Sequence, residues 1–275
     1  MPAAKAMLER LREEVMKLET RGVTPKLAIV RVGEREDDLS YERGIYKRFE
    51  AANALVETFA LPQQVSQKKL EETIKALNDD DNIHGILVFR PLPEQLNEKR
   101  IQELVAADKD VDGMTAENAA HVFAGDKQGY PPCTPQAVME ILKYYGIDVC
   151  GKKVTVVGRS MVVGRPLSML LLHQNATVTI CHTKTLNLQE ECRKADILIA
   201  CAGVPRMITR EYVREGQILI DVGIHVIEDQ LCGDLDFGSV AELAEGITPV
   251  PGGVGSVTTT VLLKHVIEGA KNLLK

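Results

Sequence analysis

The sequence predicts an α/β fold with two lobes, each built on a parallel sheet. Short runs of aliphatic and β-branched residues alternate with amphipathic stretches at helical spacing along most of the chain. Such alternation is typical of parallel sheets joined by right-handed crossovers. Near the middle, Thr134 and Pro135 supply a helix cap and a first helical residue, which predicts a helix to about Tyr145 that bridges the lobes.

The first lobe begins with a helix at residues 3–19, where apolar side chains recur at helical spacing until Gly22 and Pro25 end the pattern. The run KLAIVRV at residues 26–32 predicts a buried strand. The elements expected next are a helix at 38–55, a strand at 56–60, a helix at 67–77, a strand at 85–89, a short helix ending at Ala106 and the loop ADKDVDGMT.

The second lobe repeats the same alternation. Its expected elements are strands at 154–157, 177–181, 197–200 and 217–222, helices at 162–173 and 188–194, and a terminal helix at 258–274. The Pro- and Gly-rich segment ITPVPGGVGSVT precedes that last helix. We place the first domain at residues 1–139 plus 257–275 and the second at 140–256.

The stretch around Gly158 predicts a dinucleotide site. A buried strand ends at Gly158, which turns without a Cβ, and a helix follows whose free N–H groups and positive dipole end suit a pyrophosphate. The spacing Gly158, Ser160, Gly164 differs from the usual G-x-G-x-x-G, because serine stands at the second position. An ordinary turn between strand and helix would look the same, so this stretch alone leaves both readings open.

Composition excludes several classes of protein. The chain has 275 residues, 45% of them apolar, and a net charge of -6, with no tryptophan and no basic patch interleaved with aromatics, so we expect no nucleic-acid partner. No apolar run approaches 18 residues and no leader is evident, so we expect a cytoplasmic protein without a membrane segment. Six scattered cysteines without a C-x-x-C pair predict reduced thiols and no metal site.

Several segments together resemble the methylenetetrahydrofolate dehydrogenase/cyclohydrolase family over nearly the whole chain. The matching segments are RVG before Tyr41, GILV and PLP within 85–93, DKDVDG at 108–113, PCTP at 132–135, GRSMVVGRP at 158–166, ATVTICHTKT at 176–185, DVGI at 221–224 and PVPGGVG at 249–255. The resemblance implies an N-terminal α/β folate-binding lobe, a Rossmann-like lobe that holds NAD(P), and a homodimer. It implies hydride transfer from 5,10-methylenetetrahydrofolate to the nicotinamide, without a metal.

The resemblance also implies which residues act. Tyr41 and Asp112 are the expected catalytic residues, Tyr41 against the folate and Asp112 on the polar edge of the pterin, where a carboxylate can accept two hydrogen bonds. The further substrate-binding residues implied are Val88, Phe89, Arg90, Pro251, Gly252, Gly253, Val254 and Gly255. The cofactor-binding residues implied are Gly158, Arg159, Ser160, Val163, Gly164, His182, Thr183 and Ile224.

The chain departs from the family pattern at the positions linked to the second activity. Four residues after Tyr41 the bifunctional members carry a lysine, assigned to the cyclohydrolase step, and this chain carries Ile45. Phe89 replaces a glutamine and Arg90 its neighbour. General acid–base catalysis contributes roughly 10² to 10⁴ in rate. We therefore expect a dehydrogenase with little or no cyclohydrolase activity, since hydride transfer needs no proton donor.

The choice of cofactor and three alternatives stay open at this point. The strand at 177–181 ends without the acidic residue that selects NAD, and Arg159, Thr183 and Lys184 or His182 suit a 2′-phosphate, which favours NADP, with NAD possible. The alternatives are a bifunctional enzyme in which Arg90 compensates for the lysine, a silent folate- or nucleotide-binding protein, and a shikimate-type dehydrogenase.

Overall fold

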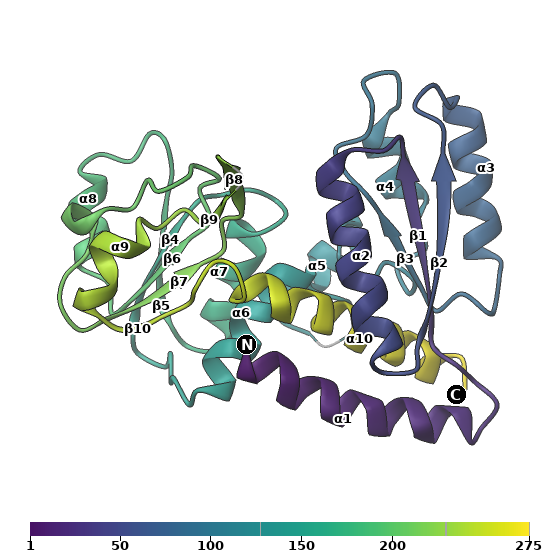
Figure 1. Cartoon of the computed structure of the whole chain (residues 1–275), viewed down its shortest axis with the longest axis horizontal. Helices are drawn as coiled ribbons and strands as arrows, with labels where there is room; N and C mark the ends of the chain where they lie inside the picture. Colours follow the sequence, from purple (N-terminus) through teal and green to yellow (C-terminus); the bar gives the residue numbers. More distant parts are fainter. Residues whose placement is uncertain (127, 229, 275) are drawn as a thin grey trace. The chain divides into compact units, whose positions relative to one another are not determined.

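The computed structural model describes residues 1–126, 128–228 and 230–274, and the chain in it forms two compact units (Figure 1). The N-terminal unit consists of Ala4–Cys133 together with Thr259–Lys275. The C-terminal unit consists of Thr134–Thr258 together with Met1–Ala3. The functional domain boundaries predicted from the sequence, at 139/140 and 256/257, stay a prediction.

The N-terminal unit is built on a three-stranded parallel sheet in the order β2-β1-β3. Its strands are β1 (Lys26–Val32), β2 (Leu55–Leu61) and β3 (Gly85–Val88). The central strand β1 is buried along most of its length, as a run of aliphatic residues predicts. The helices that belong to this part of the chain are α1 (Pro2–Glu19), α2 (Glu36–Glu50), α3 (Gln67–Asn78), α4 (Glu98–Leu104) and α5 (Ala116–Ala124).

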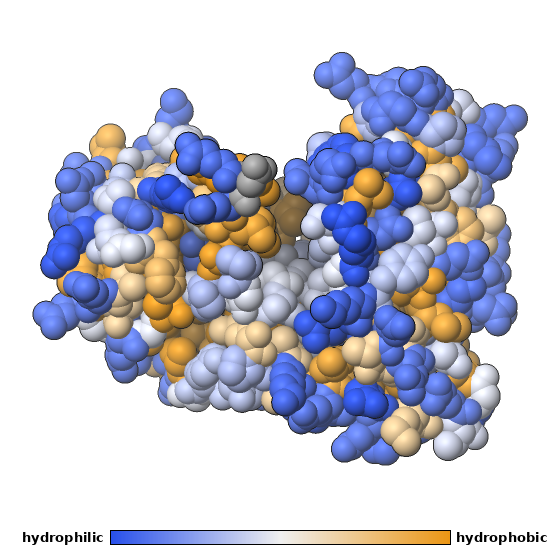
Figure 2. Space-filling model, in the orientation of Figure 1, coloured by the Kyte–Doolittle hydropathy of each residue, from blue (hydrophilic) through white to orange (hydrophobic). Residues whose placement is uncertain are grey.

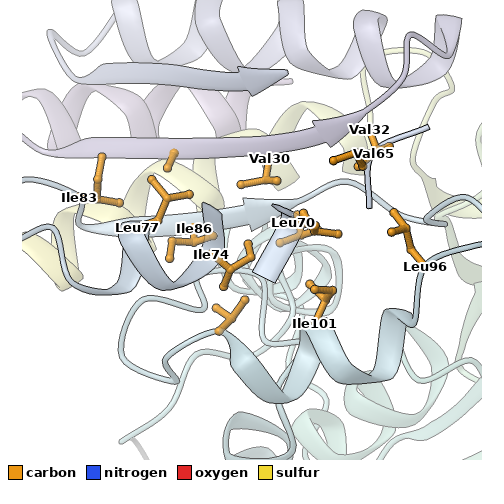
Figure 3. Close-up of a cluster of buried hydrophobic side chains, with 13 residues drawn as sticks. Val30, Val32, Val65, Leu70, Ile74, Leu77, Ile83, Ile86, Leu96 and Ile101 are labelled. Carbon is orange, nitrogen blue, oxygen red and sulfur yellow. The ribbon is translucent and has the colours of Figure 1, made fainter. Parts of the chain in front are cut away.

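One cluster of the core of this unit lies where α3 and α4 pack against β1 and β3 (Figure 3). Val30 of β1 and Ile86 of β3 meet Leu70 and Ile74 of α3 and Ile101 of α4, and all five side chains are buried. On α2, Ile45 and Phe49 are fully buried. The last helix, α10 (Val254–Asn272), also contributes buried side chains to this unit.

A close approach joins α10 to the sheet of the N-terminal unit. A Cβ placed on Gly85, the first residue of β3, would lie 2.9 Å from Val266 Cγ2. A Cβ on Gly269 would lie 2.2 Å from the carbonyl oxygen of His84. Glycine is therefore needed at both positions, because a side chain would displace the helix from the strand.

The C-terminal unit is built on a five-stranded parallel sheet in the order β10-β7-β6-β4-β5. Its strands are β4 (Lys153–Val157), β5 (Thr177–Cys181), β6 (Ile197–Ala200), β7 (Gln217–Asp221) and β10 (Ala244–Ile247). The order reverses between β4 and β6, so their carboxyl ends form the switch point at which open α/β sheets bind ligands. The helices here are α6 (Cys133–Tyr144), α7 (Gly164–His173), α8 (Leu188–Arg193) and the short α9 (Phe237–Val240).

A two-stranded hairpin, β8 (His225–Ile227) and β9 (Gln230–Cys232), follows β7. Val226 pairs with Leu231 in it, and both side chains are exposed. Figure 2 shows apolar surface there, whereas hydrophilic side chains cover the outer side of α3. Within the described ranges, no helix has the length and apolar character needed to cross a membrane.

The predicted α/β fold and its parallel strands are confirmed, with differences at particular elements. The helix predicted at 38–55 ends at Glu50, because Asn53 adopts a left-handed conformation (φ 60°) that turns the chain into β2. The last helix begins at Val254, four residues before the predicted start. Helix α5, the hairpin and β10 were not predicted.

Candidate functional site

Four of the predicted substrate residues lie around the carboxyl end of β3 in the N-terminal unit. Val88 is the last residue of that strand and is buried, and the N–H of Phe89 donates to the Val30 carbonyl of β1 at 2.9 Å. The ring of Tyr41, on α2, lies 5.6 Å from the ring of Phe89, at an interplanar angle of 33°. Tyr41 and Phe89 therefore form an aromatic wall at the edge of the sheet.

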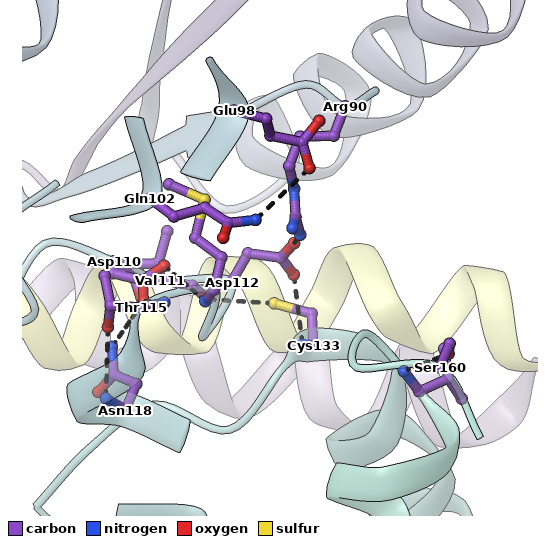
Figure 4. A network of polar contacts seen from close by, with 12 residues as sticks. Arg90, Glu98, Gln102, Asp110, Val111, Asp112, Thr115, Asn118, Cys133 and Ser160 are labelled. Atoms are coloured by element: carbon purple, nitrogen blue, oxygen red, sulfur yellow. Dashed lines mark hydrogen bonds and ion pairs between the residues drawn. The ribbon is translucent and has the colours of Figure 1, made fainter. Parts of the chain in front are cut away.

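Arg90 and Asp112 form an ion pair beside that wall (Figure 4). Arg90 Nη2 lies 3.9 Å from Asp112 Oδ2, and Asp112 Oδ1 accepts a hydrogen bond of 3.4 Å from the backbone N–H of Cys133. Burial raises the pKa of Asp112, while the charge of Arg90 opposes that rise. Burial raises the pKa of Tyr41 well above its usual value, and the nearby Asp112 charge adds to the effect.

The loop that carries Asp112 is held by two side chains that precede it, those of Lys109 and Asp110. Asp110, fully buried, accepts hydrogen bonds from the backbone N–H groups of Met114 and Thr115 and from Asn118 Nδ2. Lys109 Nζ donates to three carbonyls at the end of α3, those of Leu77, Asn78 and Asp80. The acidic loop is thus fixed in place. Within it, the side chain of Asp112 is about a quarter exposed to solvent.

The position after Asp112 requires a glycine, Gly113, for two reasons. Its φ is +62°, and a Cβ there would lie 2.4 Å from the carbonyl oxygen of Tyr130. The turn therefore brings Asp112 against the start of α6, where Cys133 donates to it. Sequence reasoning missed Cys133 as a partner, because the contact joins residues 21 apart and no local pattern marks it.

The position expected for a catalytic lysine lies in the core. Ile45 is fully buried on α2, one helical turn after Tyr41. Lys47 is exposed, on another face of the helix. Arg48 is half-buried, and burial lowers the pKa of its guanidinium. The face of α2 that carries Tyr41 thus presents an aliphatic residue at the position where the resemblance predicts an amine.

In the C-terminal unit, two glycines shape the turn between β4 and α7. Gly158 has φ +134°, and a Cβ there would lie 2.2 Å from the carbonyl oxygen of Cys201, which follows β6. A Cβ on Gly164, the first residue of α7, would lie 2.2 Å from the carbonyl oxygen of Gly158. Ser160 Oγ accepts a 3.0 Å hydrogen bond from the Val163 N–H. This tight turn at the switch point, with a glycine at each end, fits a pyrophosphate.

The other predicted cofactor residues lie at the same edge of the sheet. Arg159 follows β4 and Thr183 follows β5, and these strands are neighbours whose last residues, Val157 and Cys181, pair. Arg159, Thr183 and Lys184 are exposed. The His182 N–H donates to Thr185 Oγ1 at 2.8 Å and the Lys184 N–H to His182 Nδ1 at 3.1 Å, which closes a compact turn after β5.

The predicted substrate segment 251–255 lies where the chain enters α10. Pro251 and Gly252 are exposed, whereas Val254 and Gly255 already form the first turn of α10. A Cβ on Gly255 would lie 3.1 Å from Ile224 Cδ1, so Ile224, which is 60% exposed, lies against the start of that helix. Gly253, between Gly252 and Val254, is buried. These residues belong to the C-terminal unit, while Tyr41, Phe89 and Asp112 belong to the N-terminal one.

Sequence reasoning missed a network of buried acidic side chains that starts at Asp221, three residues before Ile224. Asp221 accepts hydrogen bonds from the N–H groups of Gly223, Asp234 and Leu235. Asp234 accepts from the N–H groups of Ala202 and Gly203 and lies 2.7 Å from His225 Nε2. In the sequence, this network is marked only by its acidic residues, in the segments DVG (221–223) and GDLD (233–236). The network ties the loops after β6 and β7 to the hairpin.

Over the described ranges, no group of three or more His, Cys, Asp or Glu side chains is arranged to hold a metal ion.

Comparisons with known proteins match both halves of the chain to one family. Residues 1–112 match the catalytic domain of tetrahydrofolate dehydrogenase/cyclohydrolase, and residues 132–274 match its NAD(P)-binding domain. The chain is 52% identical over 271 residues to the bifunctional protein FolD of Clostridioides difficile (strain 630), covering 98% of this chain and 94% of that protein.

Solved structures agree with these matches. The bifunctional FolD methylenetetrahydrofolate dehydrogenase/cyclohydrolase of Campylobacter jejuni superposes with a TM-score of 0.95 at 38% identity, covering 98% of this chain and 96% of that one. The FolD of Trypanosoma brucei, solved with NADP and an inhibitor, superposes with a TM-score of 0.94 at 34% identity, covering 99% and 96%.

Proposed function

The chain belongs to the tetrahydrofolate dehydrogenase/cyclohydrolase family, and on that premise we propose that it oxidises 5,10-methylenetetrahydrofolate to 5,10-methenyltetrahydrofolate with little or no cyclohydrolase activity. Membership makes it a methylenetetrahydrofolate dehydrogenase of that family with an NAD(P)-binding domain, and the shikimate-type alternative falls away. The proposed loss of the second activity rests on residues of this chain.

The proposed loss of the cyclohydrolase step rests on one observation. Ile45 lies in the core, on the same helix as Tyr41 of the Tyr41–Phe89 wall. Adding water to the methenyl cation and opening the ring require proton transfers, which an aliphatic side chain cannot perform. Arg90 is a poor substitute, because a guanidinium stays protonated at physiological pH and its charge already faces Asp112.

The remaining residues support the oxidation itself. A bound nicotinamide would supply the acceptor for the hydride, which would leave the one-carbon bridge with its electron pair and make the substrate a cation. We propose that Tyr41 and Phe89 pack against the flat folate and that Asp112 accepts hydrogen bonds from its polar edge. None of these roles requires the protein to move a proton during hydride transfer.

We further propose that the cofactor is NADP. Arg159 and Lys184 are exposed beyond the ends of β4 and β5, and Thr183 lies between β5 and Lys184. Two cations and a hydroxyl suit a 2′-phosphate, and no carboxylate stands at the end of β5 to hold a free 2′-hydroxyl. The FolD of Trypanosoma brucei was solved with NADP.

From the family resemblance alone we propose a cytoplasmic homodimer that acts on one-carbon derivatives of tetrahydrofolate. Light scattering that gives the mass of a single chain would contradict the dimer.

The decisive assay follows methenyl-folate absorbance after purified protein is mixed with 5,10-methylenetetrahydrofolate and either NADP or NAD. We expect the methenyl product to accumulate faster with NADP and then to decay at its spontaneous rate, whatever the enzyme concentration. Decay that accelerates in proportion to enzyme would show that the site is compensated and that the enzyme is bifunctional. No product with either cofactor would favour the silent binding protein.

A pair of variants tests the role of Ile45 directly. Ile45→Lys restores a titratable amine, and Ile45→Met is its matched control, because it changes shape at the same buried position without adding a proton donor. We expect methenyl hydrolysis to rise above the spontaneous rate in Ile45→Lys only. Equal hydrolysis in both variants would remove Ile45 as the explanation.

A further inference from the structure

We propose that Arg90 is a positioning residue that keeps the Asp112 carboxylate ionised and oriented for its ligand. The ion pair between them sets the acid limit of the pH range in which substrate binds. This inference deepens the proposed function and rests on it, because Asp112 is the residue assigned to the polar edge of the folate.

The geometry gives each carboxylate oxygen of Asp112 a different partner. Oδ2 faces Arg90 Nη2 at 3.9 Å and Oδ1 accepts from the Cys133 N–H at 3.4 Å. The two side chains are partly buried, 19% exposed for Arg90 and 24% for Asp112, so the pair is shielded from water more than a surface ion pair and still reachable by a ligand. Figure 4 shows Arg90 reaching down to Asp112 from the end of β3.

Burial and a neighbouring carboxylate disfavour the charge of Asp112, whereas Arg90 and Cys133 favour it. Burial raises the pKa of the Asp112 carboxyl most, and the nearby charge of Asp110 adds to that rise. Tyr41 and Cys133, whose own pKa values are raised by burial and then by the Asp112 charge, face it from α2 and from the start of α6. His265 of α10 lies behind Cys133, 3.7 Å from its Sγ. Arg90 supplies the opposing positive charge, and the Cys133 N–H adds a hydrogen bond to the ionised form.

Ionisation matters because of what the ligand offers. An ionised carboxylate only accepts hydrogen bonds, whereas a protonated one carries an O–H donor and loses acceptor capacity. A flat pair of N–H donors on the substrate therefore binds the ionised form better. Without Arg90, Asp112 would hold its proton to a higher pH and binding would fail over the same range.

The test compares Arg90→Gln and Arg90→Lys with wild type, and Arg100→Gln is the matched control because Arg100 pairs with Glu71 at 3.7 Å elsewhere in the same unit. The first readout is the pKa of the Asp112 carboxyl in ligand-free protein, followed by carbon NMR. We expect Arg90→Gln to raise that pKa by about one unit, the low end for losing an opposite charge at this distance. Arg90→Lys should restore most of the difference and Arg100→Gln should change nothing.

The second readout is KM for 5,10-methylenetetrahydrofolate across pH, with kcat measured in parallel. In Arg90→Gln the KM should rise about tenfold on the acid side, the equivalent of one pKa unit, and approach the wild-type value at alkaline pH. A KM raised equally at every pH would indicate a merely structural role.

The two readouts separate failures of different claims. An unchanged Asp112 pKa in Arg90→Gln overturns the inference whatever the substrate is. If wild-type protein neither oxidises nor binds the folate, the proposed function fails, while the NMR titration still decides the effect of Arg90 on Asp112.

Discussion

Asp221 is a single residue on which several loops of the C-terminal unit depend. It ends β7, is 3% exposed, and receives three backbone N–H groups, while the carboxylate of Asp234 lies close by. Burial raises the pKa of Asp221 to about 6, against the effect of the hydrogen bonds that favour its ionised form. The folded protein therefore holds a proton on Asp221 at pH values where the unfolded chain has lost it.

This difference predicts how stability depends on pH. Because the folded pKa is about 6 and the ordinary value is 3.8, the contribution of Asp221 is fully present below the ordinary value and is lost as pH rises through about 6. Urea unfolding of wild type and Asp221→Asn between these values should show the wild-type advantage shrinking by about 2 kcal/mol. Asp148→Asn, at an exposed position of the same unit, serves as control. A wild-type advantage independent of pH would refute the assignment.

At the scale of elements, α7 begins in direct contact with the turn that precedes it. Gly164 opens the helix against the carbonyl oxygen of Gly158, and Gly158 in turn lies against the end of β6. Three elements thus meet through backbone alone, at the place where the strand order reverses. The helix cannot keep this position if either residue carries a side chain.

Gly164→Ala should therefore weaken cofactor binding. The added Cβ would lie 2.2 Å from the Gly158 oxygen, and the backbone shift that relieves it costs about 1–3 kcal/mol. Steady-state kinetics should show KM for NADP rising about tenfold or more while KM for the folate stays within about twofold. Gly238→Ala, at a helical glycine of the same unit with open space around it, should leave both unchanged. Equal effects of the two variants would argue against the contact.

The same scale shows what the sequence could predict. The buried strands were found because runs such as KLAIVRV and GILV are aliphatic on both faces, as parallel strands require. Helix α5 was missed because AENAAHVFA is short and rich in alanine, so its periodicity is weak. Strands β8 and β9 have three residues each and depend on pairing with one another.

The candidate site was also predictable in part, through its resemblance to a family. Tyr41, Phe89 and Asp112 were named through the family resemblance, and the structure brings them together in one unit. The support beneath them was not predictable, because Lys109 reaches carbonyls about thirty residues away and Cys133 meets Asp112 across a loop. Contacts of that kind follow from tertiary packing and leave no local pattern.

At the scale of the whole molecule, the N-terminal unit is made from two separate stretches of chain. Its second stretch is the part of α10 from Thr259 onward, where Val261, Leu262, Val266 and Ile267 are fully buried. Lys271, near the end of the helix, forms an ion pair with Glu14 of α1. The first and last helices of the chain therefore stabilise the same unit.

A chain that ends at Thr258 should consequently lose the N-terminal unit. Each buried aliphatic side chain contributes about 1.5–3 kcal/mol, so losing the four named above removes about 6–12 kcal/mol, which is comparable to the whole stability of about 5–15 kcal/mol typical of a domain. Hydrogen exchange should show β1 and β3 unprotected, and folate oxidation should disappear. A chain that ends at Asn272, the last residue of α10, is the control and should keep both. Retained protection of β1 in the shorter chain would contradict this reading.

The position of α10 also bears on how the protein is made. A ribosome synthesises the three strands of the N-terminal sheet early, yet the helix that packs against Gly85 follows the C-terminal unit in the sequence. The unit translated first is thus completed only after the C-terminal unit has emerged and could already have folded. We expect the nascent chain to hold an apolar sheet without its covering helix until α10 has been synthesised, which makes it a substrate for chaperones that bind at the ribosome exit.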